Sequence, residues 1–205
     1  MQLKMFLAIA SVASCGTVAF AQAIPEAPID AFQVRYASNL NIGDSVINIT
    51  NAGTTNTAGA LTNICANVYT FSPDEQLISC CSCTVTPNAL VSLSANSDLV
   101  SNTLTPAHPT SIVVKIVATA NTACNAANVP TANLAQGLRA WGTTLHAAPT
   151  SPVTYQVTET AFSQAGLSAA ELARITSFCG FIQANGSGFG ICRSCRLGGL
   201  GAVSQ

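Results

Sequence analysis

The sequence predicts a mainly β fold: an antiparallel β-sandwich, immunoglobulin-like or related, with one C-terminal α-helix and a framework of disulfides. Three observations support this fold class. Short runs in which apolar residues alternate with Ser, Thr and Asn recur along residues 32–162, with turn residues between them. A segment with helical spacing follows near residues 168–184. Eight cysteines lie beyond an N-terminal stretch that has the features of an export signal.

The expected strands share a two-residue period, which directs apolar side chains to one face of a sheet. The run SIVVKIVAT, at residues 111–119, is the most apolar and is therefore expected near the centre of a sheet. Glycine-bearing or proline-rich segments, such as NAGTTNTAGA and TPAHPT, separate the runs. The expected strands are residues 32–38, 45–50, 64–71, 77–85, 88–96, 111–119, 137–146 and 153–162.

One helix is expected near residues 168–184. Ser168 and Glu171 have the spacing of a capping box, and the Asn-Gly pair that begins at Asn185 is a typical stop. Between these signals, apolar side chains recur at steps of three and four residues, which places them on one face. They are Leu172, Ile175, Phe178, Cys179 and Ile182. Because Cys179 lies on this stripe, we expect a disulfide to tie the helix to the sheet.

Residues 1–23 have the features of a signal peptide. Lys4 supplies the positive start, an apolar stretch follows, and AFAQA at residues 19–23 offers small residues for cleavage. A lipoprotein signal is the alternative, because VASC places Cys15 where a lipid would be attached. In either case residues 24–205 are expected to form a single domain that is secreted, extracellular or periplasmic.

Charged residues make up 7% of the chain, and the formal net charge is -1. This composition lacks the basic surface that nucleic-acid binding requires. After residue 23, no apolar run reaches the roughly 20 residues that span a bilayer, so no transmembrane segment is expected in the mature chain. The polar surface must instead come from Ser, Thr, Asn and Gln.

The segment ISCCSCTVT, at residues 78–86, places three cysteines within four positions. In a strand, Cys81 and Cys83 share one face while Cys80 points to the other, and close neighbours in an extended chain bond each other only with strain. We therefore expect this cluster to be bonded to the C-terminal cysteines, with Cys65 bonded to Cys124. Which cysteine of one cluster bonds which cysteine of the other stays open. Each bridge would stabilise the fold by roughly 3 to 5 kcal/mol, because it closes a loop of about 100 residues. The expected disulfide residues are Cys65, Cys80, Cys81, Cys83, Cys124, Cys179, Cys192 and Cys195.

Two other roles for these sulfurs compete with disulfides. Cys80 or Cys81, together with Cys83, Cys192 and Cys195, has the composition of a four-cysteine zinc site. The C-x-x-C spacing of CRSC is also that of thioredoxin-like redox motifs, but here the motif follows a helix in a glycine-rich segment. An oxidising compartment favours disulfides over both roles, so no metal and no cofactor is expected.

Few groups in the sequence suit catalysis, and no catalytic residue is assigned. His108 lies in a proline-rich loop and His146 ends a strand, and neither belongs to a known catalytic or metal-binding pattern. Trp141 is the single tryptophan, and with Tyr155 it is the candidate for stacking a sugar, although a lone tryptophan in a β-protein more often belongs to the core. Glycosylation sequons begin at Asn48 and Asn185.

The segments CCSCTVTPNALVSLSANSDL and FIQANGSGFGICRSC together resemble a group of secreted cysteine-rich proteins of soil bacteria. The resemblance extends over roughly residues 64–195. It implies export and a shared cysteine framework, and it implies no activity, because no activity is known to us for the group.

The function expected from these features is non-enzymatic: a secreted or cell-surface protein with a structural, adhesive or assembly role. Low charge offers little electrostatic resistance to association with copies of the same chain or with other surface proteins. The extended N-terminal segment, residues 24–38, is expected to add to an open sheet edge of a neighbour. The alternatives are a carbohydrate-binding module that stacks glycans on Trp141 and Tyr155, and a secreted hydrolase that uses His108 or His146.

Overall fold

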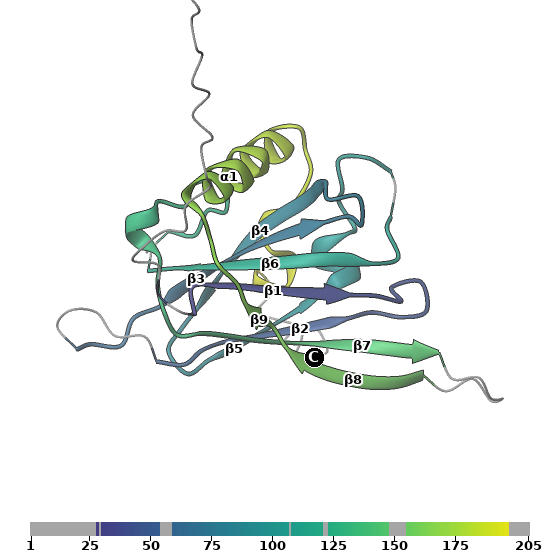
Figure 1. The fold of residues 1–205 in the computed structure, drawn as a ribbon, viewed down its shortest axis with the longest axis horizontal. Helices are drawn as coiled ribbons and strands as arrows, with labels where there is room; N and C mark the ends of the chain where they lie inside the picture. The colour runs from purple at the N-terminus through teal and green to yellow at the C-terminus, as the bar shows by residue number, and fades with distance from the viewer. Residues whose placement is uncertain are drawn as a thin grey trace, which may run out of the picture.

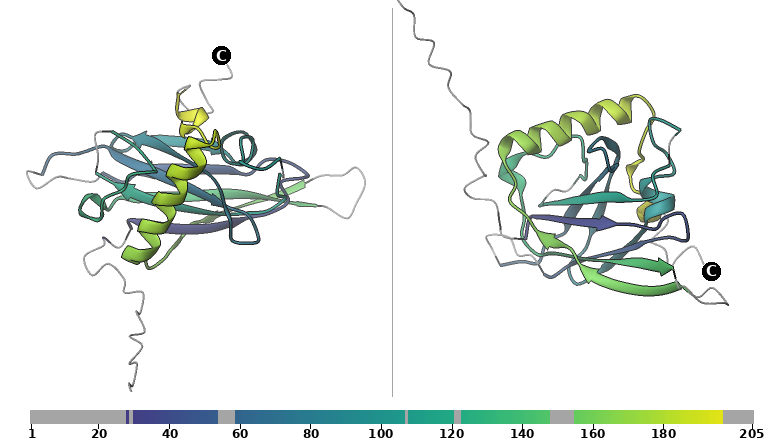
Figure 2. Two further views of the ribbon diagram at one scale, coloured as in Figure 1. Left: turned by 90° about the horizontal axis from the view of Figure 1, so that it is seen from above. Right: turned by 45° about the vertical axis from the view of Figure 1, so that its right-hand side comes forward.

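The computed structural model describes residues 28, 30–53, 59–106, 108–120, 123–147 and 155–196; the expected signal peptide lies outside them. The described chain forms three layers, in which a six-stranded sheet lies between a four-stranded sheet and helix α1 (Ala169–Ala184). Figure 1 shows α1 above the six-stranded sheet, with β7 and β8 on the far side. Seen from above, α1 crosses the strands beneath it (Figure 2). The predicted sandwich with a C-terminal helix is therefore confirmed.

Sheet 1, the six-stranded sheet, has the order β10-β4-β3-β6-β1-β9. The apolar run at 111–119 forms β6, which lies between β3 and β1 as expected. All pairs are antiparallel except β10 and β4, which run parallel because the chain turns back after α1. The strands are β1 (Phe32–Ala37), β3 (Ile64–Phe71), β4 (Leu77–Val85), β6 (Ile112–Thr119), β9 (Ser163–Gln164) and β10 (Gly190–Ile191).

Sheet 2, the four-stranded sheet, is antiparallel throughout and has the order β5-β2-β7-β8. Its strand β5 is shorter than the expected 88–96, because a π-helical turn, η1 (Ala95–Leu99), begins directly after it. The Ser94 hydroxyl caps this turn by accepting a hydrogen bond from the Ser97 N–H at 2.9 Å. The strands are β2 (Val46–Asn51), β5 (Leu90–Ser94), β7 (Leu138–Ala147) and β8 (Tyr155–Ala161).

Two apolar clusters hold the three layers together. Between the sheets, Ile47 and Ile49 of β2 pack in one cluster with Ile116 of β6. Between sheet 1 and the helix, Tyr69 of β3 packs in a second cluster with Leu172 and other α1 side chains. Strand β3 contributes to both clusters, which explains why its sequence is apolar on both faces and buried over almost its whole length.

Helix α1 begins and ends where the sequence predicts. The Ser168 hydroxyl accepts a hydrogen bond from the Glu171 N–H at 3.0 Å, and Asn185 follows the last helical residue. The buried face is Leu172, Ile175, Cys179 and Ile182. Phe178 was expected on this face but is 46% exposed, because it precedes Cys179 by one residue and so points about 100° away from it. Its ring lies beside the Arg174 guanidinium instead, at 5.5 Å.

Residues 32–37 of the expected donor segment belong to the chain's own sheet. They form β1, which pairs with β6 along its whole length and with β9 at Gln33 and Val34. Of residues 24–31, the structure describes Pro28, Asp30 and Ala31. A segment that added to a neighbouring molecule without disturbing sheet 1 would therefore have to precede Phe32.

Four disulfides join the eight described cysteines, as expected. Strand β4 explains the pattern: Cys80 points toward α1 and bonds Cys179, whereas Cys81 and Cys83 point between the sheets. The bonded Cα atoms lie 4.8 to 5.8 Å apart, which is the usual range. The pairs are Cys65–Cys124, Cys80–Cys179, Cys81–Cys192 and Cys83–Cys195.

The chain after α1 closes one flank of the sandwich. Strand β10 pairs with Cys81 and Ser82 of β4, and the short helix α2 (Arg193–Arg196) then packs against β5. The Asp98 carboxylate, 1% exposed, fastens α2 by accepting hydrogen bonds from the N–H and the hydroxyl of Ser194, both at 2.7 Å. Two disulfides and one buried carboxylate therefore hold this flank.

Candidate functional site

Strand β8 is the open edge of sheet 2, and it is the longest strand of the described chain whose residues are all exposed. All seven of its residues are exposed, and its single neighbour among the described strands is β7. The free side of such a strand presents backbone N–H and C=O groups that can pair with another strand. Edge strands commonly prevent this with Lys, Pro or a bulge, but β8 reads YQVTETA and its register with β7 is continuous.

The flank beside β8 is closed at one end only. After Ala161 the chain passes through the buried Phe162 into β9, which leaves sheet 2 and pairs with Gln33 and Val34 of β1. Figure 1 shows β9 rising from the end of β8 toward β1. Because β9 covers so little of β1, sheet 1 does not extend over β8, and both faces of β8 reach solvent.

A buried arginine lies at the base of this open flank. Arg35 of β1, 7% exposed, donates from Nη2 to the Thr144 hydroxyl at 2.8 Å and from Nε to the Thr160 hydroxyl at 3.2 Å. Its Nη1 atom has no hydrogen-bond partner in the described part of the chain. Burial lowers the pKa of the Arg35 guanidinium, and the nearby Glu159 carboxylate opposes this shift. The interior next to β8 is therefore polar.

Gly142 makes room for this guanidinium. A Cβ atom at Gly142 would lie 2.6 Å from the Arg35 Nη1 atom, which is closer than such atoms approach. The positions that follow on the inner face, Thr144 and His146, are polar as well, and the His146 Nε2 atom lies 2.8 Å from the Thr158 hydroxyl. A polar inner face explains why β7 and β8 need no cover from sheet 1 at this end.

Trp141 lies on the outer face of sheet 2, within a row of polar side chains. It is 37% exposed and stands between Asn48 of β2 and Ala161 of β8. The Asn48 amide is held on both sides: it donates to Glu159 at 3.0 Å and accepts from the Ser92 hydroxyl at 2.7 Å. An exposed indole beside oriented hydrogen-bonding groups is the type of surface that binds sugar rings.

Tyr155 shares this face with Trp141 but lies at the other end of β8. The register pairs Trp141 with Ala161 and Tyr155 with Ala147. Six residues of extended chain separate these positions, a distance of about 20 Å. The structure therefore does not bring the two expected stacking residues together, although Tyr155 is 41% exposed.

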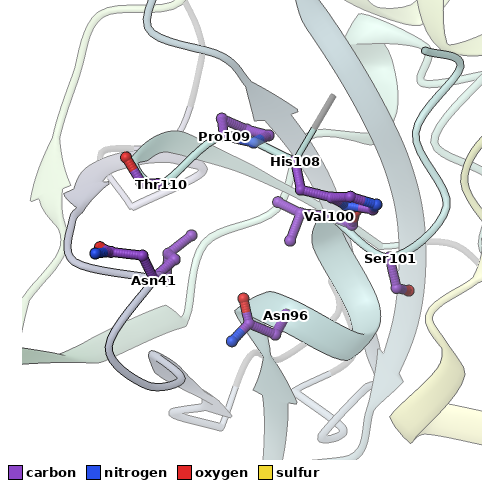
Figure 3. Close-up of a pocket in the computed structure, with 8 residues that line it drawn as sticks. Asn41, Asn96, Val100, Ser101, His108, Pro109 and Thr110 are labelled. Carbon is purple, nitrogen blue, oxygen red and sulfur yellow. The ribbon is translucent and has the colours of Figure 1, made fainter. Parts of the chain in front are cut away.

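His108 lines a shallow depression of about 370 Å³ with Asn41, Asn96 and Ser101 (Figure 3). Its Nδ1 atom donates to the Val100 carbonyl at 2.7 Å, because a carbonyl oxygen can only accept. The Ser101 hydroxyl bonds the Ser97 carbonyl instead of the imidazole. The described residues of the lining include no carboxylate, so they do not bring together the serine, histidine and acid of a hydrolase.

A larger groove of about 680 Å³ separates the first half of α1 from the turn between β3 and β4. An ion pair spans it, in which Lys115 of β6 meets Glu171 of α1 at 2.5 Å. The same ammonium lies 4.8 Å from the centre of the Phe71 ring. These contacts fasten the start of α1 to sheet 1, which gives the groove a structural explanation.

In the structure, the sulfurs that a zinc site or a redox motif would need are bonded in disulfides. Cys80 points away from Cys83, and the C-x-x-C residues Cys192 and Cys195 bond two different partners on β4. The Sγ atoms of Cys83, Cys192 and Cys195 nevertheless lie within 4.8 Å of one another.

Sequence reasoning missed two buried charged residues, Arg35 and Asp98. Arg35 alternates regularly with apolar neighbours in an expected strand, and Asp98 follows a run that was expected to remain extended. A local pattern carries little signal for either burial, because the Thr144 and Thr160 partners of Arg35 and the Ser194 partner of Asp98 are more than 90 residues away.

Comparisons of the chain with protein-family models, with curated protein sequences and with solved structures found no match. Among the described residues, no helix is both long enough and apolar enough to cross a membrane.

Proposed function

We propose that this chain is an exported, non-enzymatic structural protein that assembles with copies of itself through the edge of β8. The observation that carries the proposal is the seven-residue edge strand, exposed on both faces and without Lys, Pro or a bulge. Such an edge associates readily with other strands. A specific partner strand would occupy its free N–H and C=O groups and so prevent unspecific association.

The low charge of the chain supports a second copy of the same chain as the partner. The net charge of the whole chain is -1, and Glu159 is the one charged residue of β8. In an antiparallel pair of β8 strands centred on Val157, the two Val157 side chains lie opposite each other and each Glu159 lies opposite a Tyr155, so the two carboxylates do not face each other. Tyr155 and Val157, 41% and 59% exposed, would add apolar contacts on the outer face.

The proposed location is extracellular or periplasmic. Four disulfides persist in oxidising compartments and are rare in the cytosol, which supports export of the mature chain. Attachment through a lipid on Cys15 remains the alternative to complete secretion, and that residue lies outside the described chain.

The Val157→Lys substitution tests the assembly. Val157 is an exposed residue of the edge, so a lysine there leaves the pairing with β7 in place but resists a second strand. We expect size-exclusion chromatography with light scattering to show a concentration-dependent oligomer for the unchanged chain and a monomer for V157K.

The matched control is Thr131→Lys, which adds the same charge at an exposed position of the 3-10 turn η2 (Thr131–Asn133), outside both sheets. This variant should associate like the unchanged chain. A monomer at every concentration before any substitution, or equal association of V157K and T131K, would contradict the proposal.

A second candidate function, glycan binding, is favoured by the exposure of Trp141 beside Asn48 and Glu159. Binding would centre on Trp141 alone, because Tyr155 lies at the opposite end of β8. A glycan array followed by calorimetry tests it: Trp141→Ala should weaken binding by about 1 kcal/mol or more, because the stacking surface is lost, whereas Tyr155→Ala should preserve it. An array without any binding removes this candidate and leaves the assembly proposal untouched.

A further inference from the structure

Two of the four disulfides lie side by side between the sheets. Cys81 and Cys83 are two residues apart on β4 and therefore share its inner face, where they bond Cys192 and Cys195. The three sulfurs of Cys83, Cys192 and Cys195 all lie within 4.8 Å of one another. A thiolate formed in this group would have the sulfur of the other disulfide as its neighbour.

The Cys80–Cys179 disulfide is placed differently. It lies on the opposite face of β4, beneath α1, with both sulfurs buried. The Gln183 amide lies 3.3 Å from each of the two sulfur atoms. This disulfide is shielded from external thiols and separated by the sheet from the other pair.

Access to the adjacent pair is through one atom. Cys81, Cys83 and Cys192 are buried, with exposed fractions of 0 to 1%, whereas Cys195 is partly exposed near the end of the described chain. Thiol–disulfide exchange requires a thiolate to reach a disulfide sulfur, so an external thiol can begin only at Cys195.

We propose that the Cys81–Cys192 and Cys83–Cys195 disulfides exchange as one unit, in which attack of an external thiolate on Cys195 leads to attack of the released thiolate on Cys192. A low-molecular-weight thiolate such as glutathione attacks Sγ of Cys195, which forms a mixed disulfide there and releases the Cys83 thiolate. The Cys83 thiolate then attacks Sγ of Cys192, and the Cys81 thiolate leaves. One thiolate enters, one leaves and two disulfides remain, so the exchange needs no oxidant or reductant.

The exchange moves the anchor of the C-terminal segment two residues along β4, from Cys81 to Cys83. It also separates Cys195, and with it the end of α2, from the sheet. Asp98 would still hold Ser194, so the segment would loosen from its end inward. The flank between β4 and β5 is thus sensitive to thiols, whereas the attachment of α1 is not.

The test is disulfide mapping of the oxidised full chain after exposure to reduced glutathione at mildly alkaline pH, with acid quenching, alkylation and non-reducing peptide mass spectrometry. We expect alkylated Cys81, a Cys83–Cys192 bond, glutathione on Cys195 and an intact Cys80–Cys179 bond. Alkylated Cys83 together with an intact Cys81–Cys192 bond would overturn the proposal, because the thiolate would then have formed without being passed on.

The Cys195→Ser variant tests the second step without added thiol. It leaves Cys83 as a free thiol beside Cys192, so we expect the purified variant to contain both Cys81–Cys192 and Cys83–Cys192 forms. A folded variant that contains only the Cys81–Cys192 form would contradict the second exchange step. If the variant does not fold, the mapping of the unchanged chain decides alone.

Discussion

Tyr69 has an apolar environment and one hydrogen-bond partner. Its side chain is 0% exposed beneath α1, and its hydroxyl donates to the Ala126 carbonyl at 2.7 Å. Burial raises the pKa of the Tyr69 phenol, because the phenolate cannot be solvated there. The hydroxyl thus joins the segment that carries Ala126 to sheet 1 only while it remains protonated.

This environment predicts a loss of stability at alkaline pH. The unfolded chain ionises Tyr69 near its ordinary pKa of about 10, whereas the folded chain does not, so the contribution is complete below that pH and declines above it. Each further pH unit should cost about 1.4 kcal/mol until the raised folded pKa is reached. Urea unfolding at a series of pH values measures the slope.

The Tyr69→Phe variant isolates the contribution. It should be about 1 kcal/mol less stable at neutral pH, since one hydrogen bond is lost, and it should show a shallower alkaline decline. Tyr155→Phe, at an exposed tyrosine, is the matched control and should change neither quantity. Identical alkaline slopes for all three chains would show that Tyr69 ionises freely in the folded state.

At the scale of single residues, the sequence could predict the cysteine pattern but not the buried charges. The alternation of a strand was enough to separate Cys80 from Cys81 and Cys83. The burial of Arg35 depends on hydroxyl groups of β7 and β8 and on the space that Gly142 leaves for the guanidinium. Both follow from the packing of the two sheets. Such contacts between distant segments leave no local pattern.

At the scale of elements, the turn after α1 requires glycine. Gly188 has a φ of +70°, and a Cβ atom there would lie 2.5 Å from the Cys80 carbonyl oxygen of β4. Asn102 fixes the turn from the other side by accepting from the Gly188 N–H at 2.8 Å and donating to its carbonyl at 2.7 Å. The close approach is what allows β10 to run beside β4.

Gly188→Ala should therefore destabilise the fold by more than the about 1 to 2 kcal/mol that a left-handed backbone costs an alanine, because the clash is with the backbone of a buried strand. Gly166→Ala is the control: its Cβ would meet no atom within 4 Å, and its stability should change by less than about 0.5 kcal/mol. Denaturant midpoints measure both. Equal midpoints for the two variants would show that the turn tolerates a side chain.

Long elements were predictable and short ones were not. Capping by Ser168 and the stop at Asn185 are local signals, and the structure places α1 between them. β9 and β10 contain two residues each, and they exist because β1 and β4 offer edges to the passing chain. The π-helical turn η1 replaces the end of an expected strand because Asp98 turns inward to meet Ser94 and Ser194.

At the scale of the whole molecule, the two flanks of the sandwich differ. The flank between β4 and β5 is closed by α2, two disulfides and Asp98, whereas the flank between β1 and β8 is closed only where β9 crosses it. Disulfides with sequence separations of 111 and 112 hold the closed side, and each taken alone would contribute about 4 to 5 kcal/mol. The proposed association of copies belongs to the open side.

Hydrogen–deuterium exchange measured at increasing protein concentration tests that association most directly. If copies pair through β8, peptides that contain residues 155–161 should exchange more slowly as the concentration rises, while peptides from α1 keep their rates. Exchange in β8 that is independent of concentration, in samples that light scattering shows to be associated, would place the contact elsewhere on the molecule and contradict the proposed role of this edge.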